Sequence, residues 1–149
     1  MVCFTNIFLL KLRLVYLLLF IFFTWLALAL RSHHQWFHPL VVKYGGDIIW
    51  PGMFVFFLRA FFVNTALWKL ALVNSLLGVL DEFSQLFNAA ILVAIRQTYV
   101  GRLLFGVGFL WSYLICYAIG TLIAWVIAVW VDRLKRLTAK KEFIKMAGV

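Results

Sequence analysis

Long apolar runs separated by short polar stretches dominate the pattern along the chain. The runs are Leu14–Leu30, Ile48–Val63 (preceded by Asp47), Leu67–Phe87 and Leu103–Val131. A membrane-spanning helix needs about 17–25 mainly apolar residues at a rise of about 1.5 Å per residue. Each run is close to that length or longer, so the pattern predicts an all-α integral membrane protein with four transmembrane helices in one bundle.

Glycine and proline residues mark where these helices begin and break. Gly45 and Gly46 predict a break before the second helix, and Pro51 suits its first turn, where a missing N–H costs little. The fourth run would be about 43 Å long as one helix, which exceeds a bilayer core of about 30 Å. We therefore expect a break at Gly106 and Gly108, with a short interfacial or re-entrant segment between the third and fourth helices.

The first run also resembles a secretory signal peptide, because Ala27-Leu28-Ala29 has the small-x-small pattern of a cleavage site. Its apolar region is longer than the usual 7–15 residues of such peptides, and further apolar runs follow it. We therefore expect the first run to be a retained helix.

Composition agrees with a lipid environment. Hydrophobic residues make up 66% of the chain and charged residues 13%, against about 45–50% and about 25% in a soluble domain. A soluble globule could not bury that much apolar side chain, so a soluble enzyme, a secreted disulfide scaffold and a disordered tail are excluded. The two cysteines, Cys3 and Cys116, lie in different contexts and form no disulfide framework.

Basic residues outnumber acidic ones by 14 to 5, and their placement predicts an orientation. Six of them follow the last apolar run: Arg133, Lys135, Arg136, Lys140, Lys141 and Lys145. The positive-inside rule accounts for this placement, with contact to anionic lipid in addition, and no stacking platform for nucleic acid accompanies the charges. We expect both termini in the cytoplasm, with a transmembrane domain over residues 11–131 and a basic tail over residues 132–149.

Charged and polar residues inside the apolar runs are the candidates for function, because they are costly at membrane depth. Arg59 lies about 18 Å along the helix axis from Asp47, so we expect its head to reach the membrane surface by snorkelling. In the third run, Asn74, Gly78, Glu82 and Gln85 are spaced by 4, 4 and 3. That spacing predicts one polar, small-residue face turned toward a helix or a cavity.

The expected topology brings Asp47, Glu82, Gln85 and Arg96 to the outer face of the membrane. A structural ion pair between Glu82 and Arg96 is one interpretation, and a binding site for a lipid-linked or polar headgroup is the other. Two carboxylates near an interface could also bind a cation or carry protons, but their spacing is not diagnostic.

Small residues recur every four positions in the fourth run: Gly108, Ser112, Cys116, Gly120, Ala124 and Ala128. Such a face allows membrane helices to approach closely, so we interpret it as a helix-packing face and Cys116 as a packing residue.

No enzymatic or metal motif is recognisable. His34 and His38 have a spacing that could hold zinc on a helix, but Trp36, Phe37 and Pro39 favour an aromatic interface loop there. There is no glycine-rich phosphate loop, nucleophile elbow or HExxH motif. We expect no enzymatic activity, no metal site and no cofactor.

Several blocks, in their order and spacing, are similar to the signature of one family. They are Tyr44-Gly45-Gly46-Asp47-Ile48-Ile49-Trp50, Glu82-Phe83-Ser84-Gln85, Arg96-Gln97-Thr98 with Gly101 and Gly106, and Tyr117 with Gly120. Over about residues 11–131 the chain resembles the domain-of-unknown-function 2809 family of small bacterial membrane proteins. The resemblance implies a bacterial inner-membrane location and adds Trp50 to the candidate residues.

The chain also resembles, more loosely, the VanZ-like proteins. These are four-helix membrane proteins with an acidic-x-x-Gln element, and they are associated with glycopeptide resistance. This likeness implies an envelope lipid or a cell-wall-related ligand. The chain departs from the family where Tyr113 replaces a usual acid, which argues against a metal site that needs a third carboxylate. It also has Arg31-Ser32 where Ser-Arg is expected.

Together these observations predict an outward-facing site that binds membrane lipid or a lipid-linked envelope ligand. Its candidate residues are Asp47, Trp50, Glu82, Gln85 and Arg96. Two alternatives stay open. One is a small transporter subunit in which Asp47 and Glu82 carry protons or cations, and the other is a structural subunit that uses the small-residue face to bind a protein partner or a second copy.

Overall fold

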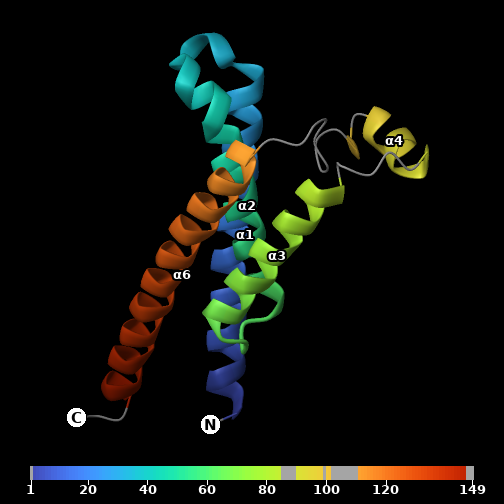
Figure 1. Ribbon diagram of the computed structural model, residues 1–149. Helices are drawn as coiled ribbons and strands as arrows, with labels where there is room; N and C mark the ends of the chain where they lie inside the picture. Colours follow the sequence, from blue (N-terminus) through green and yellow to red (C-terminus); the bar gives the residue numbers. More distant parts are fainter. Residues whose placement is uncertain (1, 85–89, 99, 102–110, 147–149) are drawn as a thin grey trace.

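The computed structural model describes residues 2–84, 90–98, 100–101 and 111–146, and every regular element within them is helical. In chain order the elements are α1 (Val2–Ser32), the 3-10 turn η1 (His34–Trp36), α2 (Pro39–Phe61), α3 (Leu67–Ser84), α4 (Ala90–Gln97) and α6 (Trp111–Met146). Figure 1 shows α1, α2, α3 and α6 as a bundle whose successive helices alternate in direction. The predicted all-α class is confirmed for these residues.

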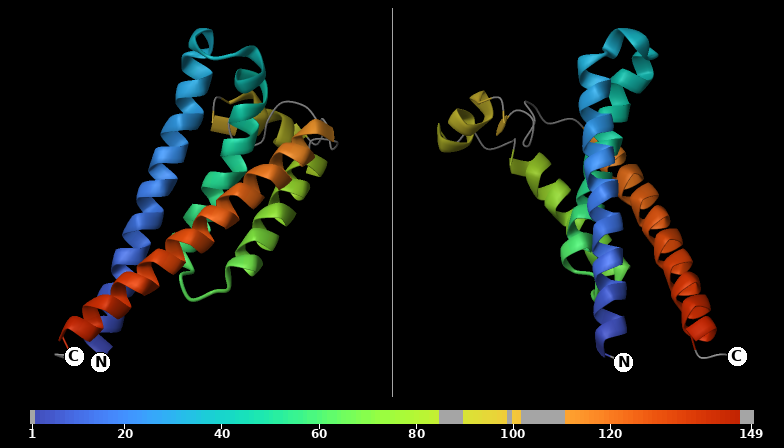
Figure 2. Two further views of the ribbon diagram at one scale, coloured as in Figure 1. Left: turned by 90° about the vertical axis from the view of Figure 1, so that its left-hand side faces the viewer. Right: turned by 180° about the vertical axis from the view of Figure 1, so that it is seen from behind.

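Helix α2 is the centre of the bundle. It packs against α1, α3 and α6, whereas α1 and α6 touch each other very little. Figure 2 shows α1 and α2 side by side, with α6 crossing them at an angle and α3 next to α6. The main hydrophobic cluster joins α1, α2 and α6: Leu12, Tyr16, Val55, Phe56, Ala60, Val63, Ala124 and Ala128. This arrangement sets the heights at which polar groups of different helices meet.

Three helices are long and apolar enough to cross a membrane, which is one fewer than predicted. They are Ile7–Ser32, Pro39–Phe61 and Trp111–Ala139. Helix α3 has 18 residues, and Lys69, Asp81 and Glu82 fall within them. The helix is long enough to cross a bilayer core. Its three charged residues, however, make it less apolar than the other three long helices and than the sequence run indicated.

The second helix begins 12 residues before Pro51, at Pro39, and this corrects the predicted break at Gly45 and Gly46. His38 caps the helix, because its Nδ1 accepts from the Leu40 N–H at 3.3 Å, and Pro39 occupies the first turn. The glycines lie inside the helix against α1, where a Cβ on Gly45 would come 3.3 Å from Leu30 Cδ1. The glycine pair is therefore a packing site between α1 and α2.

Pro51 lies inside α2, at the point where that helix crosses α6. A proline removes one backbone hydrogen bond from the helix interior. A Cβ on Gly120 of α6 would collide with the Ile48 carbonyl oxygen and come 2.9 Å from Pro51 Cγ. A Cβ on Gly52 would in turn lie 3.2 Å from the Gly120 carbonyl oxygen. Only residues without a side chain allow the two backbones to approach this closely.

The small-residue face of α6 points into the bundle along its described length. Cys116, Gly120, Ala124 and Ala128 are buried, and Ser112 is half-buried. Gly108 lies outside the described residues, as does Gly106. Between the small residues, large apolar side chains of α6 face outward: Trp111, Ile115, Ile119, Leu122, Ile123, Val126 and Trp130. This pattern of small residues inside and large apolar residues outside is typical of a helix packed in lipid.

Two further predictions concern the start of the basic tail and the segment between α3 and α6. The proposed boundary between residues 131 and 132 falls inside this helix, which continues without interruption to Met146. The basic segment is thus the last part of the helix whose residues Trp111–Ala139 are long and apolar enough to cross a membrane. The expected interfacial or re-entrant segment contains the eight-residue helix α4, while its flanking residues 85–89, 99 and 102–110 lie outside the described part.

Candidate functional site

Side chains from four helices gather at the end of the bundle where α1 meets α2. Asp47 of α2 is half-buried, and Glu82 of α3 is only 2% exposed. Both carboxylates lie within electrostatic range of Tyr113 and Tyr117 on α6. The structure therefore brings Asp47 and Glu82 to the same face of α6.

Arg31, in the last turn of α1, supplies a positive charge beside these residues. We call Arg31, Asp47, Glu82, Tyr113 and Tyr117 the outer cluster. The Arg31 guanidinium acts on Asp47 through Coulomb attraction, and its Nε would lie 3.9 Å from a Cβ on Gly46. The sequence pattern indicated Arg96 for the cationic role, and Arg31 was not among the predicted site residues. The available signal was the order of the runs, because Arg31 directly follows the first apolar run and Asp47 directly precedes the second.

Helix α3 presents its polar face to α6. Asn74, Gly78 and Glu82 are all buried, as their spacing predicted. Gly78 lies against the ring of Tyr117, with which any Cβ at this position would collide. The close approach of α3 and α6 places Glu82 one turn of helix above that contact.

Asn74 connects three helices in the middle of the bundle. Its Nδ2 donates to the Pro51 carbonyl oxygen at 3.1 Å and to Thr121 Oγ1 at 2.8 Å. All three groups are buried, so each hydrogen bond satisfies a polar atom that lipid could not. Thr121 was not among the predicted site residues, because it lies one position beyond the small-residue face.

The other predicted site residues have different positions. Trp50 is buried between α1 and α2 with Ala27 and Met53, and its ring packs edge-on against Phe54 at 5.9 Å between centroids. It is a packing residue in this structure. Gln85 and the side chain of Arg96 lie outside the described residues, so the Glu82–Arg96 pair stays a prediction.

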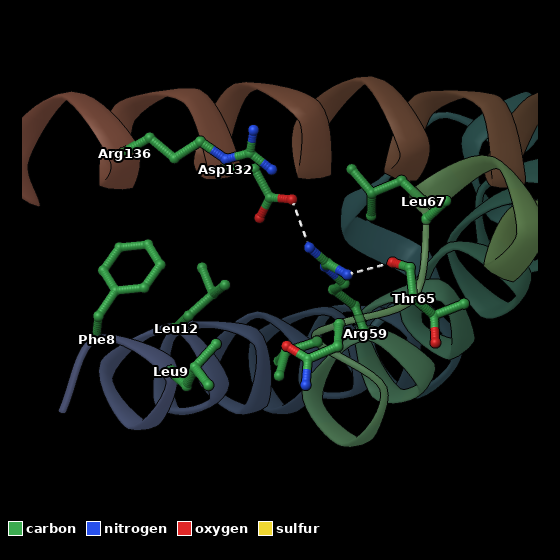
Figure 3. Close-up of a pocket in the computed structure, with 11 residues that line it drawn as sticks. Phe8, Leu9, Leu12, Arg59, Thr65, Leu67, Asp132 and Arg136 are labelled. Atoms are coloured by element: carbon green, nitrogen blue, oxygen red, sulfur yellow. Dashed lines mark hydrogen bonds and ion pairs between the residues drawn. The ribbon is translucent and has the colours of Figure 1, made fainter. Parts of the chain in front are cut away.

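A second polar cluster, which we call the inner cluster, is buried at the opposite end of the bundle (Figure 3). Arg59 Nη2 and Asp132 Oδ2 form an ion pair at 2.7 Å. Tyr16 Oη donates to Asp132 Oδ1 at 2.7 Å and lies 3.0 Å from the Ala128 carbonyl oxygen. Arg59 Nη1 donates to the Thr65 carbonyl oxygen at 2.6 Å. The cluster joins α1, α2, α6 and the connection to α3.

This inner cluster corrects the prediction that Arg59 snorkels to the membrane surface. Arg59 is 4% exposed and Asp132 7% exposed, so both charges are inside the protein. The prediction failed because Asp132 was counted with the basic tail, although it is one helical turn from the buried Ala128. An acid directly after an apolar run, at the start of a mainly basic segment, was the signal that could have identified it.

Groups suited to metal binding do not converge within the described residues. No three or more histidine, cysteine, aspartate or glutamate side chains there are arranged to hold a metal ion. His38 instead caps α2 through its Nδ1. The outer cluster offers carboxylate oxygens as acceptors and tyrosine hydroxyls as donors, which can hydrogen-bond a hydroxylated or amino-bearing headgroup.

The comparison with family models gives one match. The model described as a protein of unknown function, DUF2809, matches residues 33–121. That range includes Asp47, Asn74, Glu82 and Gly120, but ends before Asp132. No solved structure matches the chain.

Proposed function

The chain belongs to the DUF2809 family, whose function is unknown, and from its own residues we propose that it binds the polar headgroup of an amphiphilic ligand at the outer membrane face. The observation that carries this proposal is the convergence of Asp47 and Glu82, from two helices, on the tyrosine-bearing face of α6. Ionisable groups held at membrane depth are costly, which makes them candidates for function.

The chemistry of the outer cluster favours a ligand rich in hydroxyl or amino groups. Carboxylates accept hydrogen bonds from such donors, and Arg31 and the two tyrosines can donate to the acceptors of the same headgroup. An envelope lipid or a lipid-linked cell-wall intermediate has this chemistry together with an apolar chain. No catalytic step is part of the proposal.

The arrangement in the membrane follows from α3. Its charges stand near its ends, at Lys69 and at Asp81 and Glu82, and 11 uncharged residues, Leu70–Leu80, separate them. Large apolar side chains cover its outer surface: Trp68, Leu72, Val73, Leu76, Leu77, Val79, Leu80 and Phe83. We infer that α3 is a fourth crossing, with lipid on its outer side and its polar face on α6.

The proposed membrane is the bacterial inner membrane, with both termini in the cytoplasm. The basic residues of α6 beyond Asp132, together with Lys11 and Arg13, stand at one end of the bundle, and the positive-inside rule assigns that end to the cytoplasm. The outer cluster then faces away from the cytoplasm.

A distance in the structure favours binding over proton or cation transport. Thr121, in the Asn74 layer, and Asp132, in the inner cluster, are 11 residues apart on α6, which is about 16 Å along the axis. Ala124, Ala128 and Phe56 fill the core at these heights, and all three are buried. A conducting route would need polar groups or water across this apolar layer.

Native mass spectrometry of the full chain in mild detergent tests the proposal. We expect a co-purified amphiphile on the wild type that is lost from Asp47→Asn and Glu82→Gln, because each change removes one negative acceptor from the site while keeping its shape. Lys69→Gln, an exposed change at the other end of α3, is the matched control and should keep the ligand. Absence of an adduct from the wild type, or its retention on both carboxylate variants, would contradict the proposal.

A further inference from the structure

A cavity of about 450 Å³ lies at the inner end of the bundle, between the first part of α1, the connection from α2 to α3, and α6. Arg59 lines it, 12 residues beyond Asp47 on α2, so it is about 18 Å from the outer cluster along the helix. The volume falls within the roughly 300–1,000 Å³ of small-molecule sites. The cavity is therefore separate from the proposed outer site.

One positive charge on the wall of this cavity is not balanced by the inner cluster. Both oxygens of Asp132 are occupied, Oδ1 by Tyr16 and Oδ2 by Arg59. Arg136, one helical turn further along α6, also lines the cavity and forms no ion pair with any carboxylate in the described part of the chain. The cavity can thus supply donors and one net positive charge to an anion.

The opposite wall is apolar. Figure 3 shows Phe8, Leu9 and Leu12 of α1 on one side of the cavity and Arg136 and Asp132 of α6 on the other. An anion without an apolar part would leave the α1 side chains in contact with water or empty space. A cationic wall facing an apolar wall fits an amphiphile with a negatively charged head.

We propose that this cavity binds the phosphate headgroup of an anionic phospholipid. Arg136 contacts the phosphate, Arg59 with its carbonyl and carboxylate partners forms the rigid floor, and the first part of the acyl chain lies along Phe8, Leu9 and Leu12. The exposed basic residue Lys141, further along the same helix, adds positive charge at this end of the bundle. The site differs from the outer one in position, in charge and in ligand.

Lipid titration of the delipidated full chain in detergent, followed by native mass spectrometry, tests the assignment. Phosphatidylglycerol should bind more tightly than phosphatidylcholine with the same acyl chains. Arg136→Gln should weaken phosphatidylglycerol binding roughly tenfold, the effect of losing one charge-assisted hydrogen bond. Leu9→Trp, which fills the cavity without changing charge, should weaken it as well. Arg133→Gln, the matched control on the neighbouring exposed residue, should bind like the wild type.

Four results would overturn the assignment. Equal weakening by Arg133→Gln and Arg136→Gln would indicate attraction to the basic surface as a whole, and full binding by Leu9→Trp would place the lipid outside the cavity. Equal affinity for the two lipids would remove the role of charge. Displacement of the lipid by an equal concentration of inorganic phosphate would identify a site for bare phosphate. Asp47→Asn should leave this titration unchanged, so failure of the outer site is distinguishable from failure of this one.

Discussion

Arg59 and Asp132 are the residues whose burial most affects the energetics of the bundle. A buried ion pair is stable only when its geometry is good and its remaining polar atoms are satisfied. Here the pair is 2.7 Å long, Tyr16 occupies the second carboxylate oxygen, and the Thr65 carbonyl oxygen accepts from the guanidinium. These contacts hold α1, α2 and α6 at one relative height, because each partner comes from a different element.

Removal of one partner of this pair should destabilise the protein strongly. We expect Arg59→Gln and Asp132→Asn each to lower the free energy of unfolding by about 3–5 kcal/mol, because the remaining charge stays buried without compensation. The double variant should lose less than the sum of the two changes. Thermal unfolding in detergent measures the effect, with Arg133→Gln as the exposed control. Strictly additive losses would mean that the two side chains are not energetically coupled.

At the scale of the elements, the crossing of α2 and α6 depends on the absence of side chains at two glycines. Gly120 meets the Ile48 carbonyl oxygen and Pro51, while Gly52 faces the Gly120 carbonyl oxygen. In lipid, helices associate through close packing and hydrogen bonds, since no hydrophobic effect drives one apolar helix onto another. Asn74 supports the same crossing by binding both Pro51 and Thr121.

A single added methyl group at this crossing should separate the two helices. Gly120→Ala should lower stability by about 1–3 kcal/mol, as overpacking of a well-packed contact does. Gly46→Ala is the matched control, because its Cβ would meet Arg31 Nε at an ordinary 3.9 Å. This change should be neutral or slightly stabilising, since alanine favours a helix over glycine. Unfolding temperatures of the two variants in one detergent decide the point, and equal values would remove the argument for a close crossing.

For the whole molecule, the direction of the helices determines how many times the chain crosses the membrane. Helices α2 and α6 run in the same direction in Figure 1, and α3 runs in the opposite direction between them. In the proposed topology, two parallel spans require a return through the membrane, and α3, at about 27 Å, has the length for it. Three apolar spans alone would leave the two ends of the chain on opposite sides.

Cysteine labelling in intact cells distinguishes these two topologies. In a background without Cys3 and Cys116, we expect Gln35→Cys to react with a membrane-impermeant maleimide. Asn64→Cys and Lys141→Cys should react only after lysis, because the positive-inside rule assigns both to the cytoplasm. Reaction of Lys141→Cys in intact cells, with Asn64→Cys protected, would show three crossings and rule out α3 as a spanning helix.

The sequence by itself determined the features that depend on local periodicity. The long apolar runs predicted membrane helices, and the four-residue spacing predicted the buried faces of α3 and α6, including Asn74, Gly78, Glu82 and Gly120. Such patterns are readable because a helix repeats every 3.6 residues and lipid or a neighbouring helix selects one side of it.

Only the tertiary structure decided which polar groups meet across helices. Arg59 and Asp132 are 73 residues apart, and Tyr16 and Asp132 are 116 apart. No local pattern encodes these pairings, because they depend on the crossing angle of α2 and α6 and on the relative heights of three helices. The crossing also brings the Asn74 amide to the Pro51 carbonyl oxygen and Gly120 of α6 against the proline ring. Tertiary packing also places Arg31 beside Asp47, since the position of Arg31 is set by the packing of α1 on the glycine pair of α2.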